Sequence, residues 1–90
     1  MSQILITAQT GVATSVKFYV RDDNHKTISA NGLTGAEYVD VLVEHGNTLI
    51  PSGVENRLTA TSPTKIIAGT GNYAVQKSST ASPVSVAFAV

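Results

Sequence analysis

The sequence predicts a single all-β domain, an antiparallel β-sandwich or small barrel of about seven or eight short strands. Two observations predict this fold class. Apolar and polar residues alternate with a period of two in several short segments, and turn-forming residues separate these segments about every ten residues. A chain of 90 residues can enclose one core between two β layers and is too short for a second. We therefore expect residues 1–90 to form one domain.

Two segments in the first quarter of the chain show this alternation. Ser2–Gln9 is the first predicted strand, and Gly11 follows it as a break. Ser15–Arg21 is the second, and its alternation is the clearest in the chain. The apolar residues of this second strand are predicted to point inward: Val16, Phe18 and Val20.

Turn-forming residues come directly after the second strand. Asp22-Asp23-Asn24-His25 contains residue types that turns prefer. Lys26–Ala30 then returns as a short strand, with Ile28 inward. We therefore predict that Ser15–Arg21 and Lys26–Ala30 pair as a hairpin.

A second hairpin is predicted in the middle of the chain. Tyr38–His45 alternates as a strand, and a helix over Gly35–His45 is less favoured because β-branched valines are restricted at χ1 in a helix. Gly46-Asn47 can adopt positive φ at low cost, which predicts a tight turn. Thr48–Ile50 follows as a strand that ends at a proline. One face of the longer strand is formed by valines: Val39, Val41 and Val43.

The last third of the chain contains four more candidate strands, Glu55–Thr61, Thr64–Ala68, Asn72–Lys77 and Val84–Val90. In the first of them Leu58 and Ala60 share one side. We expect the final strand to be paired and covered, because an apolar alternating terminal segment otherwise frays, and we predict that Asn72–Lys77 is its antiparallel neighbour. Its apolar face comprises Val84, Val86, Phe88 and Val90.

Composition excludes several classes of function. Six basic and six acidic residues give a net charge of +0, so no field attracts a polyanion and we expect no nucleic-acid partner. The charged fraction of 13% is about half of that usual in soluble proteins, which favours a protein that works in an assembly. The chain has no cysteine, and hence no disulfide or thiolate site. The features of a signal peptide or a membrane helix are missing, so we expect synthesis in the cytoplasm and no membrane partner.

The chain lacks a recognisable catalytic or metal-binding motif. His25 and His45 lie in different predicted turns without metal-ligand spacing, so two solvated histidines are favoured over a metal site or a general base. Asp22-Asp23-Asn24 lacks the order of a calcium loop, and Gly69-Thr70-Gly71 lacks the lysine of a phosphate loop. No serine stands in a Gly-x-Ser-x-Gly motif. We therefore expect no enzyme activity, no metal and no cofactor.

The best candidates for function are interface residues. Small side chains lie opposite the apolar face of the last strand, and two tyrosines lie on predicted outward faces: Ser85, Ala87 and Ala89, with Tyr19 and Tyr38. A face of small, uncharged residues tolerates contact with another chain, although the N-terminal segment of the same chain could equally cover it. An alternative is a carbohydrate-binding or adhesin module that uses the two tyrosines and the loop Asp22–Lys26.

Several segments from Leu33 to Val90 also carry a family resemblance. Leu33–Val41, Leu58–Ala60, Gly69–Lys77 and the final valine-rich strand come in an order that resembles the small β-sandwich virion proteins of tailed bacteriophages. The resemblance implies a non-enzymatic capsid decoration or cement protein that binds the major capsid protein across capsomer junctions, often as a trimer. It implies location on the virion. A tail or fibre component is the alternative within the same group.

Overall fold

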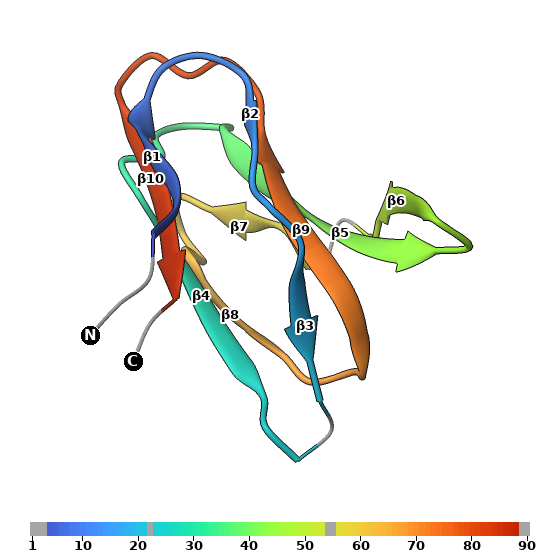
Figure 1. The fold of residues 1–90 in the computed structure, drawn as a ribbon. Helices are drawn as coiled ribbons and strands as arrows, with labels where there is room; N and C mark the ends of the chain where they lie inside the picture. The colour runs from blue at the N-terminus through green and yellow to red at the C-terminus, as the bar shows by residue number, and fades with distance from the viewer. Residues whose placement is uncertain (1–3, 22, 54–55, 89–90) are drawn as a thin grey trace.

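The computed structural model describes residues 4–21, 23–53 and 56–88, which form ten strands in two antiparallel sheets (Figure 1). Sheet A has the order β1 (Ile4–Gln9), β10 (Val84–Phe88), β4 (Lys26–Asn31) and β8 (Thr64–Ile67). Sheet B is built around β9 (Gly71–Lys77) and β5 (Tyr38–His45). The remaining strands flank these two: β2 (Ala13–Thr14) and β3 (Phe18–Val20) pair with β9, and β6 (Thr48–Pro51) and β7 (Leu58–Thr59) pair with β5. The predicted all-β class is confirmed.

The core lies between the two sheets and consists mainly of β-branched residues. Every second residue of the central strands points inward, as the pleat requires. Sheet B contributes Val20, Val39 and Val75, and sheet A contributes Ile28 and Val86, all of which are fully buried. At one end of the core the half-buried rings of Phe18, Phe88 and Tyr73 meet, with Phe18 edge-on to Phe88 at 5.0 Å between ring centroids and stacked on Tyr73 at 6.2 Å. These rings join the two layers.

The hairpin predicted in the middle of the chain is confirmed. The strand β5 has the predicted bounds, and its register with β6 closes at His45 and Thr48. Gly46 and Asn47 both have positive φ, at 55° and 72°, which is the requirement of the type I′ turn that matches the strand twist. The two inward valines Val39 and Val41 are buried as expected.

The described residues contain no helix that is long and apolar enough to cross a membrane.

The prediction that Val16 points inward is wrong, because its side chain is 72% exposed. The reason is a break between β2 and β3, both of which pair with β9. Ser15 interrupts the alternation by binding Val75 twice: its backbone N–H donates to the Val75 carbonyl at 2.8 Å, and its hydroxyl accepts the Val75 N–H at 3.0 Å. The regular strand therefore begins only at Phe18.

The predicted hairpin of Ser15–Arg21 with Lys26–Ala30 is also wrong. The first segment supplies β3, which pairs with β9 in sheet B, and the second supplies β4, which lies between β10 and β8 in sheet A. The connection between them leads from one sheet to the other, and among the described residues an isolated bridge joins Arg21 to Asn24. Ile28 is nevertheless buried as predicted, since either pairing would place it in the core.

The predicted pairing of Asn72–Lys77 with the last strand is wrong for the same reason. The strand β9 lies in sheet B, whereas β10 lies in sheet A between β1 and β4. The connection between β9 and β10 crosses the end of the sandwich beside the connection between β1 and β2 (Figure 1), and the Thr80 N–H donates to the Thr10 carbonyl at 2.9 Å. Two neighbouring crossings that run in opposite directions thus replace the predicted hairpin, as is common in sandwiches.

Two further details of the last third differ from the prediction. Ala60 is exposed, although Leu58 is buried as expected. The strand β7 ends at Thr59, because the Thr59 N–H donates to the Ser62 carbonyl and its hydroxyl accepts the Ser62 N–H, which forms a turn. Val90 lies outside the described residues.

Candidate docking interface

The outer face of sheet A carries uncharged side chains across all four strands. Residues directly opposite one another in a sheet share a face, and the register aligns Ile4, Ala87, Ser29 and Thr64 in one row from β1 to β8. A second row pairs Ser85 with Asn31, and a third pairs Thr27 with Ile66. We call this set the sheet A face: Ile4, Thr27, Ser29, Asn31, Thr64, Ile66, Ser85 and Ala87.

The sheet A face is exposed and partly apolar. Ile4 on β1 is 62% exposed and Ile66 on β8 is 68% exposed. Between them the surface is small and hydroxyl-rich, with the Thr64 hydroxyl 3.4 Å from the Ser29 hydroxyl. In the described part of the chain this face includes no charged side chain. Depletion of charged residues is one part of the compositional signal of the centre of a protein interface, and enrichment in aromatic residues, Met and Arg is the other part. The sheet A face shows the first part and not the second.

Sheet B presents the opposite character on its outer face. Lys17 forms an ion pair with Glu44 at 2.7 Å, and Arg57 forms one with Asp40 at 2.7 Å. The Lys17 ammonium, assisted by the Asn72 amide, lowers the pKa of the Glu44 carboxyl. The Asp40 carboxylate likewise raises the pKa of the Arg57 guanidinium. The four residues of these two ion pairs therefore place their charges on the side of sheet B. The sheet A face is neutral.

Two of the predicted interface residues, Ser85 and Ala87, lie on the sheet A face and are half-buried. The alternative was that the N-terminal segment covers them. From Ile4 onward that segment forms β1, which lies beside β10 as a neighbouring strand of the same sheet. It therefore extends the face and does not cover it. Ala89 lies outside the described residues.

The two predicted tyrosines lie on sheet B and are not adjacent. Tyr19 pairs with Asn72, whose amide reaches Glu44 near one end of β5, whereas Tyr38 begins β5 at the other end. Six residues of strand separate these positions along β5, or about 20 Å. The Tyr38 ring is also covered on one side by the Arg57 guanidinium, 3.9 Å from the ring centroid. The tyrosines therefore do not form a joint platform for a sugar.

The two histidines are exposed and lie in different parts of the fold. His25 precedes β4 and His45 ends β5. Within the described residues no group of three or more His, Cys, Asp or Glu side chains lies close enough to hold a metal ion. Asp22 in the predicted loop lies outside the described residues, and Asp23 pairs with Arg21 at 3.2 Å on the surface.

A buried lysine is the polar feature that sequence reasoning missed. Lys77 is 0% exposed, and its ammonium donates to the backbone carbonyls of Gly11 and Ser78. It thereby fixes the end of β9 to the loop before β2. The signal was available, because Lys77 follows Tyr73 and Val75 at a period of two on the inward face of β9.

Glu37 completes a polar network at the same end of the sandwich. Its carboxylate accepts the Ala81 N–H at 2.8 Å and the Thr34 N–H at 3.0 Å. These backbone N–H groups, with a smaller contribution from the charge of Lys77, lower the pKa of Glu37. Through these bonds Glu37 joins the connection between β4 and β5, at Thr34, to the connection between β9 and β10, at Ala81.

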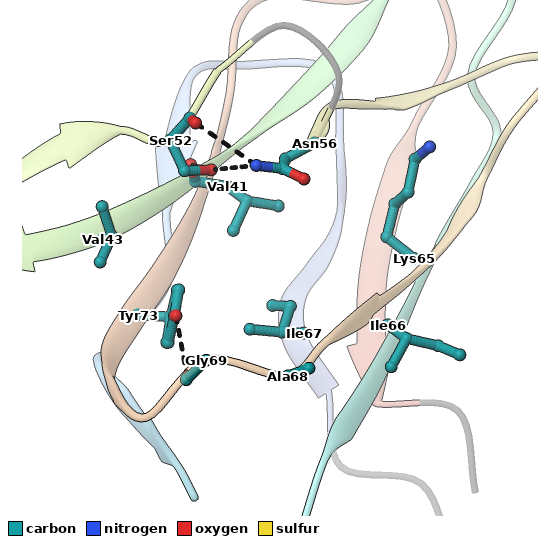
Figure 2. A pocket seen from close by; sticks show the side chains of 10 residues that line it. All are labelled: Val41, Val43, Ser52, Asn56, Lys65, Ile66, Ile67, Ala68, Gly69 and Tyr73. Carbon is teal, nitrogen blue, oxygen red and sulfur yellow. Dashed lines mark hydrogen bonds between the residues drawn. The ribbon is translucent and has the colours of Figure 1, made fainter. Parts of the chain in front are cut away.

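A cavity of about 220 Å³ lies between the sheets beside β8 (Figure 2). Val41, Val43 and Tyr73 of sheet B face Ile67 of β8 across it. At one end the Asn56 amide donates to the carbonyl and the hydroxyl of Ser52, at 3.3 Å each. At the other end the Tyr73 hydroxyl donates to the Gly69 carbonyl at 2.9 Å. The volume is below the roughly 300–1,000 Å³ of sites for drug-sized ligands.

Comparison of the chain with known proteins gives no match to a family model, to a curated protein or to a solved structure.

Proposed function

We propose that this chain is a non-enzymatic structural protein of a phage virion, which binds the capsid lattice through the sheet A face and stabilises the head as a decoration or cement protein. The observation that supports this proposal is the neutral sheet A face, opposite a sheet B on which the charges are paired. A docking face must lose its water, and uncharged small side chains lose it at lower cost than Lys or Glu.

The mechanism is attachment without chemistry. The exposed Ile4 and Ile66 supply apolar area at the two edges of the face, and the hydroxyl and amide groups between them supply hydrogen bonds to a protein surface. A contact of this kind is modest for one copy. A lattice offers many equivalent sites, and subunits bridged by a bound copy separate only when several contacts break together, so the shell resists expansion more strongly than one contact would suggest.

The test uses heads from a phage strain that lacks the gene for this chain. Purified protein is added, and bound copies are counted after sedimentation. Ala87→Lys places a charge at the centre of the sheet A face, and Thr48→Lys places the same charge at the β5–β6 turn on sheet B as a matched control. Because an unpaired interfacial charge costs several kcal/mol, Ala87→Lys should weaken binding about tenfold or more, with Thr48→Lys unchanged.

Heat release of the packaged DNA provides the second measurement. Heads with bound protein should retain DNA to a higher temperature than bare heads, and the Ala87→Lys protein should restore little of this difference. Equal binding by the two lysine variants would refute the assignment of the face. Binding of the wild-type chain to purified tails and not to heads would replace the decoration role with a tail role, and binding to neither would overturn the proposal.

A further inference from the structure

The strand β8 is an edge of sheet A, and its free side is defined by its pairing with β4. The Ala30 N–H donates to the Pro63 carbonyl at 2.9 Å. Hydrogen-bonded and non-hydrogen-bonded pairs alternate along an antiparallel ladder, so the peptide groups of Lys65 and Ile67 face β4. Those of Ile66 therefore face away from β4, toward the open edge of the sheet.

This edge has two of the features that hinder pairing between strands of different molecules, its length of four residues and the inward-pointing Lys65, but it has neither a bulge nor a proline within the strand. Such features include bulges, prolines within the strand and charged side chains on its surface. The other edge of sheet A, β1, has two register shifts against β10. The register of β8 with β4 is regular over all four residues, and Lys65 points to the side of the cavity (Figure 2). The outward side chain in the middle of the edge is Ile66, which is 68% exposed.

We propose that β8 pairs with β8 of a second copy of this chain, antiparallel and about a two-fold axis at Ile66. In this register Ile66 lies opposite Ile66 of the second copy, and the two residues exchange both backbone hydrogen bonds. Lys65 lies opposite Ile67 of the second copy, so the two lysines are not opposed. A two-fold contact uses the same surface on both molecules, and the net charge of +0 gives the copies no overall repulsion.

The contact buries apolar surface on the outer side of the sheet, because Ile67 on the inner side is already only 7% exposed within one chain. On the outer side the two exposed Ile66 side chains become neighbours. On the inner side Ile67 of the second copy lies beside Lys65, on the side of the cavity lined by Val41, Val43 and Tyr73. The four strands of sheet A continue into those of the second copy, which doubles the neutral face. The pairing concerns the edge of the sheet and does not depend on the proposed function.

Cysteine cross-linking tests the register, because the chain has no cysteine of its own. Ile66→Cys places two thiols on a hydrogen-bonded pair with Cα atoms about 5.5 Å apart, within the range of about 4.4–6.8 Å that a disulfide requires. Thr64→Cys is the matched control on the same strand and the same face. Thr64 lies opposite Ala68 of the second copy, so two copies of Thr64 are offset by four residues, or about 13 Å.

Under mild oxidation Ile66→Cys should form a disulfide-linked dimer about tenfold faster or more than Thr64→Cys. Light scattering of the wild-type protein at high micromolar concentration should give twice the mass of one chain, and Ile66→Lys should give the mass of one chain with an unchanged circular dichroism spectrum. A wild-type monomer, the trimer that the phage resemblance implies, or equal cross-linking at the two positions would overturn the pairing. Binding of the Ala87→Lys protein to heads tests the docking proposal, and cross-linking and mass test the β8 pairing. Failure of one proposal can therefore be told apart from failure of the other.

Discussion

Gly32→Ala should destabilise the fold far more than the same substitution at Gly35. Both glycines lie in the connection after β4, and both have positive φ, at 104° and 59°. A Cβ at Gly32 would overlap the carbonyl oxygen of Pro83, whereas a Cβ at Gly35 would meet open space. Gly32 therefore allows the end of β4 to lie close to Pro83, which leads into β10. The difference in stability between Gly32→Ala and Gly35→Ala measures the effect of this close contact.

The magnitudes follow from these two differences. An alanine at Gly35 incurs backbone strain of about 1–2 kcal/mol and recovers about 0.4–1 kcal/mol from a less flexible unfolded chain, a net loss near 1 kcal/mol. At Gly32 the backbone strain of about 1–3 kcal/mol is joined by steric overlap worth about 1–3 kcal/mol. The expected loss is about 3 kcal/mol, or about 2 kcal/mol more than at Gly35, from a total of roughly 5–15 kcal/mol.

Urea unfolding measures this difference. With a slope of about 1–3 kcal/mol/M, a difference of about 2 kcal/mol separates the two midpoints by about 0.7–2 M. Equal midpoints for Gly32→Ala and Gly35→Ala would refute the reasoning, because they would show that β4 and the start of β10 can separate freely. Loss of folding in Gly32→Ala alone would agree with it.

Two further predictions concern the core and the polar network. Val20→Ala removes two methyl groups from a fully buried site and should lower the free energy of unfolding by about 2–3 kcal/mol. Val16→Ala, at an exposed site, should change the free energy of unfolding by less than about 0.5 kcal/mol. Comparable losses for the two variants in urea unfolding would contradict the outward orientation of Val16. The pKa of Glu37 is lowered from its ordinary value of 4.5 in the folded chain, so its contribution to stability is present above that pH and is lost as the pH falls through the folded pKa. The urea midpoint should therefore fall below about pH 4.5, and Glu37→Gln should reduce that fall; an identical pH profile in the variant would remove Glu37 as a cause.

Local chemistry made much of the fold predictable. The alternation in Tyr38–His45 and the Gly46-Asn47 turn each depend on nearby residues alone, and both are confirmed. Burial of Ile28, Val84 and Val86 was also predicted from alternation. These features hold in any sheet arrangement, because the period of two decides which side chains share a face before the pairing partner is known.

The pairing partners were not predictable in the same way. Neighbouring strands usually pair, and two predicted hairpins followed that tendency. In both cases the chain crosses to the other sheet, since β3 and β9 lie in sheet B whereas β4 and β10 lie in sheet A. The choice between a hairpin and a crossing depends on contacts between residues far apart in sequence, such as the bond between Thr80 and Thr10. Sequence alternation contains no information about such contacts.

The candidate interface combines a predictable and an unpredictable part. The residues Ser85 and Ala87 were identified from the small side chains opposite an apolar face, but their neighbours on β4 and β8 could be known only from the register. Lys and Glu side chains fit readily on the solvated face of an antiparallel sheet, so folding of one chain does not require Ser29 or Thr64 there. The fold places its ion pairs on sheet B instead. Our proposal gives a reason for a neutral face that folding does not require, namely contact with another protein surface. The docking test examines the centre of this face at Ala87, and the β8 cross-link examines its edge at Ile66.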